Sequence, residues 1–314
     1  MLRDRDFKRR FTDVFQSYSF RFDNIFGQDS NTQDIYYKVV RPVTMAAMHG
    51  YNGTALVYGQ TTSGKTYTML GTPDKPGILP CTLCDIFTQI KKDKEHEYSI
   101  SVSYMEIYNE VINDLLVPGS TNLKVKDDAN EGVVVAGLRK ELLKGFEEAI
   151  DLVNYGEEHR CYRETSVHDN SSRSHTIFKV YIENKSKGES MIKKSCLNLV
   201  DLAGSERLNE FDMRVEVTGE AGYINKSLFV LTNVINRLAE GKGGYIPYRD
   251  SKLTRVLSIA LGGNSLTSII CTVSPAIMNF HQTLSTLRFA TRAKIVENAP
   301  KINQVCFFLM GIVC

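Results

Sequence analysis

The chain has no tryptophan, few prolines and almost no net charge. Its 314 residues include 8 prolines, and 38 Lys and Arg against 36 Asp and Glu leave a formal charge of +2. A balance so close to zero gives no argument for a nucleic-acid partner, which needs a strongly basic face. No Pro/Gly/Ser-rich linker, internal repeat or low-complexity run divides the chain. We therefore expect one globular domain, which suits 42% hydrophobic and 24% charged residues.

Disulfide frameworks and membrane spans are also missing. The seven cysteines are scattered and odd in number, and no signal peptide opens the chain, which favours a reduced intracellular protein. Cys81-x-x-Cys84 has no second pair at metal spacing, so we expect both cysteines to pack on a helix. The apolar run 305–314 has ten residues, whereas a membrane helix needs about twenty. We treat it as a tail with no assigned domain and expect no membrane association.

One loop has strong chemical meaning. Residues 59–66 fit G-x-x-x-x-G-K-[ST], in which backbone N–H groups and a following helix dipole bind phosphate. Residues 54–58 predict a buried strand entering the loop, and 65–70 predict the helix leaving it. Lys65 is expected to reach the β and γ phosphates of a nucleoside triphosphate, and the Thr66 hydroxyl to hold Mg²⁺. The alternative interpretation is a plain glycine-rich turn.

Strand and helix signals alternate along the chain, as is typical of an α/β sheet with helices on both faces. Residues 99–108 and 178–182 alternate with a period of two, while 196–200 and 266–273 predict buried strands. Two helices are predicted by apolar residues spaced three and four apart. They cover residues 224–238 and 253–261, and each ends before glycine.

Two further segments suit hydrolysis, which requires a sensor for the γ-phosphate and a way to place water. Asp201 follows a predicted strand, where an aspartate can order a Mg²⁺ shell, and Gly204 would let its N–H approach the γ-phosphate. Residues 171–175 pack three hydroxyls and a guanidinium together, groups that suit Mg²⁺, water and phosphate. The alternatives are a structural turn and a serine-rich surface loop.

In this order, GQTTSGKTYTM, SSRSH and DLAGSE resemble the P-loop, switch I and switch II of kinesin motor domains. Further matches are YNGTALVYGQ before the loop, VSYMEIYNE at 102–110, INKSL at 224–228, YRDSKLTR at 248–255 and TLRFATRAKIVENAP at 286–300. The resemblance covers about residues 20–304, so we treat 1–304 as one motor domain. The residues of SYMEIYNE, HTIF and the NAP segment are most similar to those of the centromere-associated, CENP-E-like branch (kinesin-7).

The resemblance implies a three-layer α/β P-loop NTPase motor core with a mixed central sheet, which hydrolyses ATP and moves on microtubules. By the same resemblance, the nucleotide is held by Gly59, Gln60, Thr61, Thr62, Ser63, Gly64, Lys65, Thr66 and Tyr67. Thr66 and Ser172 coordinate Mg²⁺, and Asp201 supports that shell through water. Gly204 senses the γ-phosphate. Arg173 and Glu206 form the salt bridge that closes switch I on switch II and orders the attacking water.

An acidic partner such as tubulin predicts a basic face on the motor. The resemblance places that face at Lys226, Arg249, Lys252 and Arg255. Without the resemblance, a solvated surface with Asp250 as internal partner is favoured. Residues 293–300 resemble the start of a neck linker after the core, which implies plus-end-directed movement and a cytoplasmic location on microtubules or the spindle. A homodimer would need a heptad coiled coil, which does not follow within this sequence.

The sequence departs from the family pattern at three places. An opening strand with R-x-R-P is not found, so either the first strand and part of the base pocket are missing or residues 8–15 supply a substitute. His168 stands where switch I carries Asn, and 208–215 replace a T-G-A-x-G loop that helps to sense the microtubule. These departures keep open a degenerate kinesin-like microtubule-binding protein with impaired ATP turnover. A P-loop NTPase with another partner is the third hypothesis.

Overall fold

The computed structural model describes residues 17–129, 131–165, 173–188, 191–206, 220–241 and 243–306. Five features discussed above lie wholly or partly outside these ranges: His168, Ser172, the candidate strand 8–15, the loop 208–215 and the tail 305–314, of which only Val305 and Cys306 are described.

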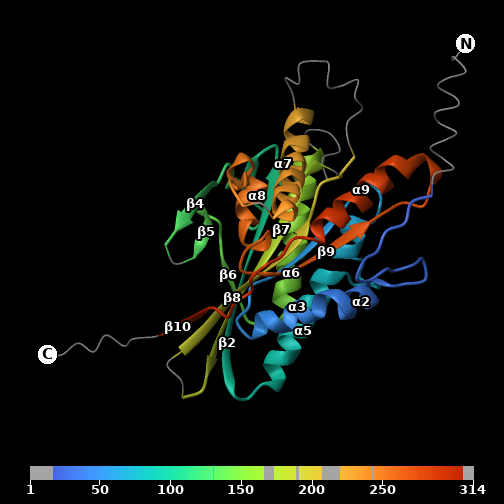
Figure 1. The fold of residues 1–314 in the computed structure, drawn as a ribbon. Helices are drawn as coiled ribbons and strands as arrows, with labels where there is room; N and C mark the ends of the chain where they lie inside the picture. The colour runs from blue at the N-terminus through green and yellow to red at the C-terminus, as the bar shows by residue number, and fades with distance from the viewer. Residues whose placement is uncertain are drawn as a thin grey trace, which may run out of the picture.

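A mixed β-sheet forms the middle layer of the fold (Figure 1). Its strands are β1 (Gly53–Gly59), β2 (His96–Tyr108), β3 (Val111–Asp114), β7 (His175–Ser186), β8 (Met191–Asp201) and β9 (Leu266–Thr272), in the order β3-β2-β7-β8-β1-β9. β1 pairs in parallel with β8 and β9, whereas β2, β7 and β8 pair antiparallel. Two short strands pair antiparallel with strands of this sheet: β6 (Glu141–Leu143) with β2, and β10 (Gln304–Cys306) with β8. A separate hairpin pairs β4 (Lys124–Asp128) with β5 (Gly132–Ala136).

Helices cover both faces of the sheet, as the sequence predicts (Figure 1). One face carries α2 (Thr32–Ile35), a π-helical segment (Tyr36–Val40), α3 (Arg41–Met48), α5 (Ile78–Lys92) and α6 (Phe146–Thr165). The other carries α7 (Glu220–Glu240), α8 (Lys252–Val256) and α9 (Phe280–Ala293), with short 3₁₀ turns at Tyr248–Asp250, Ser258–Ala260 and Ile277–Asn279. α4 (Lys65–Met69) follows β1 directly. The three-layer α/β fold is therefore confirmed.

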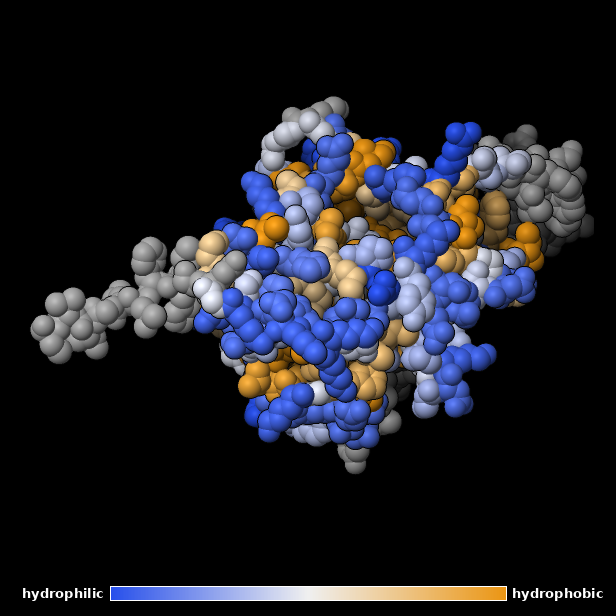
Figure 2. Space-filling view, turned by 90° about the horizontal axis from the view of Figure 1, so that it is seen from below, coloured by the Kyte–Doolittle hydropathy of each residue, from blue (hydrophilic) through white to orange (hydrophobic). Residues whose placement is uncertain are grey.

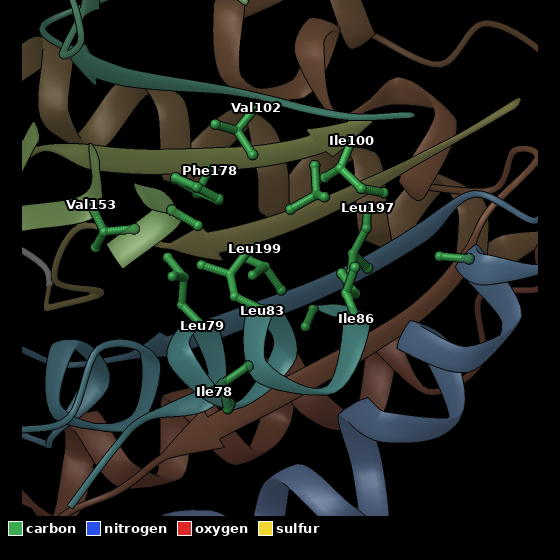
Figure 3. Close-up of a cluster of buried hydrophobic side chains, with 14 of the residues drawn as sticks. Ile78, Leu79, Leu83, Ile86, Ile100, Val102, Val153, Phe178, Leu197 and Leu199 are labelled. Atoms are coloured by element: carbon green, nitrogen blue, oxygen red, sulfur yellow. The ribbon is translucent and has the colours of Figure 1, made fainter. Parts of the chain in front are cut away.

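Two buried clusters hold the layers together. On one face, Ile78, Leu79, Leu83 and Ile86 of α5 pack towards the sheet, where Phe178 meets them (Figure 3). Burying each of these aliphatic side chains contributes about 1.5–3 kcal/mol. Successive strand residues point to opposite faces, so the neighbouring Ile177 belongs to the second cluster, beneath α7 and α9.

Two sequence predictions need correction. Every residue of β9 is only half-buried, because β9 lies at the edge of the sheet and no described strand pairs with its outer side. The predicted helix 253–261 is interrupted: α8 ends at Val256, and the chain continues as a 3₁₀ turn. The Ala260 carbonyl, at the end of this turn, accepts from the Thr267 hydroxyl at 2.8 Å and from the Asn298 amide at 3.1 Å.

Seen from below the view of Figure 1, the surface is mainly hydrophilic, with hydrophobic residues in separate patches (Figure 2). Within the described ranges, no helix combines the length and apolar character needed to cross a membrane. Cys81 and Cys84 both lie on α5, Cys81 partly buried and Cys84 exposed.

Candidate nucleotide-binding site

The loop between β1 and α4 has the backbone that its glycines allow. Gly64, which precedes α4, has a φ of +95°, a conformation that other residues rarely adopt. A Cβ at Gly59 would lie 2.3 Å from the Thr272 carbonyl oxygen, so the close approach of β1 to β9 requires glycine there. The Ser63 hydroxyl lies 2.7 Å from that of Thr272 and ties the loop to the same strand.

The side chain of Lys65 folds back onto the phosphate loop. Its side chain is buried, and its Nζ donates to the Gln60 carbonyl at 2.9 Å. Burial lowers the pKa of Lys65, while the nearby Asp201 and Glu206 carboxylates act in the opposite direction. The ammonium group is thus held at the phosphate loop by the Gln60 carbonyl, where it would add positive charge for a bound phosphate.

Asp201 ends β8 beside the start of α4. Its Oδ2 accepts from the Thr66 hydroxyl at 2.6 Å, and its buried Oδ1 has no hydrogen-bond partner among the described residues. Burial raises the pKa of Asp201, and the hydrogen bond from Thr66 partly offsets this effect. A hydroxyl and an unpaired carboxylate oxygen are hard oxygen groups that suit Mg²⁺ and its bound waters. The described part of the chain therefore fits the expected ion.

The segment after Asp201 runs along the phosphate loop. The Leu202 N–H donates to Val57 at 3.3 Å and the Ser205 N–H donates to Gly59 at 3.0 Å. A Cβ at Gly204 would lie 2.3 Å from the Thr61 hydroxyl oxygen. A side chain at 204 would therefore displace the Thr61 hydroxyl and the Glu206 carboxylate, which lie on either side of this glycine.

In this structure the Glu206 carboxylate contacts Thr61 and not Arg173, so the ion pair expected on closure of switch I on switch II stays a prediction. The Glu206 carboxylate accepts from the Thr61 backbone N–H at 2.7 Å and also from the Thr61 hydroxyl. Two donors on one residue therefore hold the carboxylate against the phosphate loop. Arg173 is exposed beside the start of β7 and has no ion-pair partner among the described residues.

Tyr67 lies on the first turns of α4 with an exposed ring. It borders a cleft of about 630 Å³. The other lining residues are Gln28, Asp29, Ser30, Asn31, Thr32, Gln33, Ile35, Thr68, Asp74, Lys75 and Pro76. The cleft therefore adjoins the phosphate loop on the side of the segment before α2.

Two buried residues near the site were not singled out from the sequence. Arg160 of α6 donates to the Ser174 hydroxyl at 3.3 Å and lies 3.5 Å from the Glu157 carboxylate. His175 contacts both the segment after Asp201 and α7. The sequence feature that could have pointed to Arg160 is a cation within the segment that forms α6. For His175 it is the last position of SSRSH.

The predicted basic face has an internal acidic partner. Arg249 and Arg255 each place an Nη2 3.1 Å from the same oxygen of Asp127, on the β4–β5 hairpin. Asp127, rather than Asp250, is thus the internal partner. Lys226 is exposed on α7, and Lys252 lies at the first position of α8.

The motif VSYMEIYNE has a structural use in this region. Its last residue, Glu110, accepts from the Ser251 hydroxyl at 2.6 Å and from the Lys252 N–H at 2.8 Å. A carboxylate at a helix N-terminus satisfies free N–H groups there. Glu110 therefore fixes the start of α8, and with it the position of the basic residues Lys252 and Arg255 on this helix.

The segment after α9 lies along the edge of the core. The Asn298 side chain makes four hydrogen bonds, to Ala260, Gly262, Ser265 and Thr267. Asn303 bonds the Gly50 carbonyl through both its backbone N–H and its amide, at 3.0 and 3.1 Å. β10 then pairs with the first residues of β8. The sequence predicted where this segment begins but not its pairing with β8.

Comparisons with known proteins agree with this geometry. The family model for the kinesin motor domain matches residues 4–296. Kinesin-like protein KIN-7L of Oryza sativa subsp. japonica is 47% identical over 293 residues, which cover 91% of this chain and 46% of that protein. Centromere-associated protein E of Homo sapiens is 46% identical over 298 residues, 92% of this chain and 11% of that protein. The chain thus spans less than half the length of these relatives.

Solved structures share the fold. A fast kinesin has a TM-score of 0.85 at 42% identity, covering 94% of this chain and 84% of that one. A KIF14 dimer in a two-heads-bound state, in complex with AMP-PNP and a microtubule, has a TM-score of 0.82 at 38% identity. That alignment covers 93% of this chain and 86% of that one.

Proposed function

Because this chain belongs to the kinesin motor domain family, with kinesin-7 proteins among its relatives, we propose that it is an ATP-driven microtubule motor. The observation that carries the proposal is the pairing of Thr66 with Asp201 beside a phosphate loop whose lysine is buried. This arrangement suits phosphoryl transfer, which depends on positioning and charge stabilisation.

ATP would bind with its phosphates on residues 59–66 and its nucleoside end in the cleft beside Tyr67. Thr66 and Ser172 would hold Mg²⁺, with Asp201 acting through water, and the ion would offset charge that develops on the phosphate oxygens. Gly204 would present its N–H to the γ-phosphate. Glu206 would leave Thr61 and meet Arg173 as switch I and switch II close, which orders the attacking water.

The partner surface would consist of Lys226, Arg249, Lys252 and Arg255, which offer positive charge to acidic tubulin. Movement would use the segment after α9, where β10 pairs with β8. Release of this pairing would change the direction of the chain that follows. A segment of this kind placed after the core supports plus-end-directed movement.

The experiment that tests the proposal is ATP turnover with and without microtubules, for the wild type and Lys65→Ala. Loss of the cation should lower the rate by about 10²–10³ or more. Lys91→Ala makes the same charge change at an exposed position of α5 and serves as the control. Wild-type turnover in Lys65→Ala would contradict the site. Microtubule binding by a wild type without turnover would support the degenerate, non-hydrolysing alternative.

A further inference from the structure

His175 is a buried imidazole that joins three parts of the fold. It is the first residue of β7 and only 2% exposed. Its Nδ1 lies 2.9 Å from the Ala203 backbone nitrogen, and its Nε2 lies 2.7 Å from the Ser227 hydroxyl on α7. Ala203 belongs to the segment beside the phosphate loop. Ser227 is buried and directly follows Lys226, a residue of the proposed microtubule face.

The direction of both hydrogen bonds follows from the backbone. A peptide N–H can only donate, so Nδ1 accepts from Ala203, and Nε2 then carries the proton and donates to Ser227. Burial lowers the pKa of His175 to about 3, with a further contribution from the cations of Arg160 and Lys65. The ring therefore stays neutral with a single tautomer at physiological pH.

A flat ring bonded at both nitrogens keeps its two partners at a fixed separation. A shift of Ser227 with α7 must either break a short buried hydrogen bond or move the ring and the Ala203 N–H with it. Breaking such a bond leaves a buried donor unsatisfied, which is the more costly outcome. Ala203 directly precedes Gly204, so displacement of α7 would reach the loop expected to sense the γ-phosphate.

We propose that His175 is a positioning residue that couples α7 to the loop after Asp201, so that microtubule contact on α7 adjusts hydrolysis through this ring. The inference rests on the proposed motor function. The competing explanation is a histidine that only fills the core, whose loss would lower stability and all activities together.

Ser227→Ala is the least disruptive test, because it removes the acceptor and leaves the ring in place. His175→Asn is the second variant, since its amide oxygen can still accept from Ala203 but cannot reach Ser227. Thr232→Val is the matched control on α7, as the Thr232 hydroxyl donates within its own helix, to Leu228 at 2.9 Å. ATP affinity, basal turnover and the ratio of microtubule-stimulated to basal turnover would be measured for each variant.

We expect the stimulation ratio of Ser227→Ala and His175→Asn to fall by roughly fivefold or more, the usual lower range for coupling between two sites. The double variant should be no worse than either single one, and Thr232→Val should match the wild type. Hydrogen exchange on the protein without microtubules gives a second readout. Ser227→Ala should speed exchange of the Ala203 amide, while Thr232→Val should not.

Unchanged Ala203 exchange in Ser227→Ala would overturn the coupling, whatever the turnover rates are. Basal and stimulated turnover that fall in the same proportion would also overturn it, because the ring would then be structural. A third outcome is a wild type without microtubule stimulation in which Ala203 exchange still responds to Ser227→Ala. That result would contradict the proposed motor function, and it would also overturn the role of His175 in transmitting microtubule contact to the hydrolysis site.

Discussion

The Thr66 hydroxyl donates to the Asp201 carboxylate across 2.6 Å and so joins the start of α4 to the end of β8. Both residues lie next to the phosphate loop, but they come from different strand–loop units and are 135 positions apart. The hydrogen bond therefore fixes the relative position of the two segments that would handle Mg²⁺ and phosphate.

Asp201→Asn should separate activity from stability. We expect ATP turnover to fall by about 10²–10³, because a neutral amide cannot stabilise the charge around the phosphates. Burial raises the pKa of Asp201, so the folded state holds its ionised form at a cost. The variant should therefore melt at pH 7 no earlier than the wild type. Asp151→Asn, at an exposed position of α6, controls for the chemical change. A lower melting temperature together with lost activity would mean that unfolding explains the loss.

Arg173 and Glu206 should behave as one unit during turnover, although Glu206 lies on Thr61 in this structure. Alanine at either position should slow hydrolysis and leave ATP binding nearly unchanged, and the double variant should be no slower than either single one. The control cycle pairs Arg173 with the exposed Glu95, for which the two effects should add. Additive losses for Arg173 and Glu206 would show that their ion pair does not form during hydrolysis.

The basic face should respond to charge in both directions. Arg249→Ala should weaken microtubule co-sedimentation by about twofold to fivefold at low salt, with less effect at higher ionic strength. Asp127→Asn should strengthen binding, because it removes the carboxylate that offsets two arginines. Lys91→Ala on α5 is the control for charge alone. Unchanged binding in Asp127→Asn would show that these arginines do not meet the partner.

Acid should destabilise the protein through His175. The unfolded residue binds a proton near its ordinary pKa of 6.5, whereas the folded one does so only near about 3. Stability from this residue is therefore complete above pH 6.5 and is lost as the pH falls, by at most about 1.4 kcal/mol per pH unit. His175→Asn should show a smaller loss between pH 6.5 and 5 in chemical denaturation. Identical slopes for both proteins would contradict the buried, neutral ring.

Local sequence patterns predicted the elements well where one short segment decides its own structure. The run before Gly59 and the apolar residues before Asp201 became β1 and β8, and the spacing of 224–238 became part of α7. The role of Gly204 towards the γ-phosphate stays a prediction, although its neighbours Thr61 and Glu206 leave little room for a side chain there.

Pairings between distant segments could not be predicted in this way. Asp127 meets Arg249 across 122 positions, and Glu206 meets Thr61 across 145. A charged residue in the sequence has many possible partners, and the tertiary fold decides among them. The edge position of β9 has the same origin, since an apolar run does not reveal whether a second neighbour covers it.

The pairing of β10 with β8 has a mechanical consequence. A pull along β10 loads its three residue pairs in shear, so that they must yield together. A pull away from the sheet at Cys306 peels them one after another, and each hydrogen bond contributes only about 0.5–1.5 kcal/mol. Peeling would then reach Asn303 and finally Asn298, whose four side-chain hydrogen bonds form the firmer anchor. The same short strand is therefore stiff towards load in one direction and compliant in another.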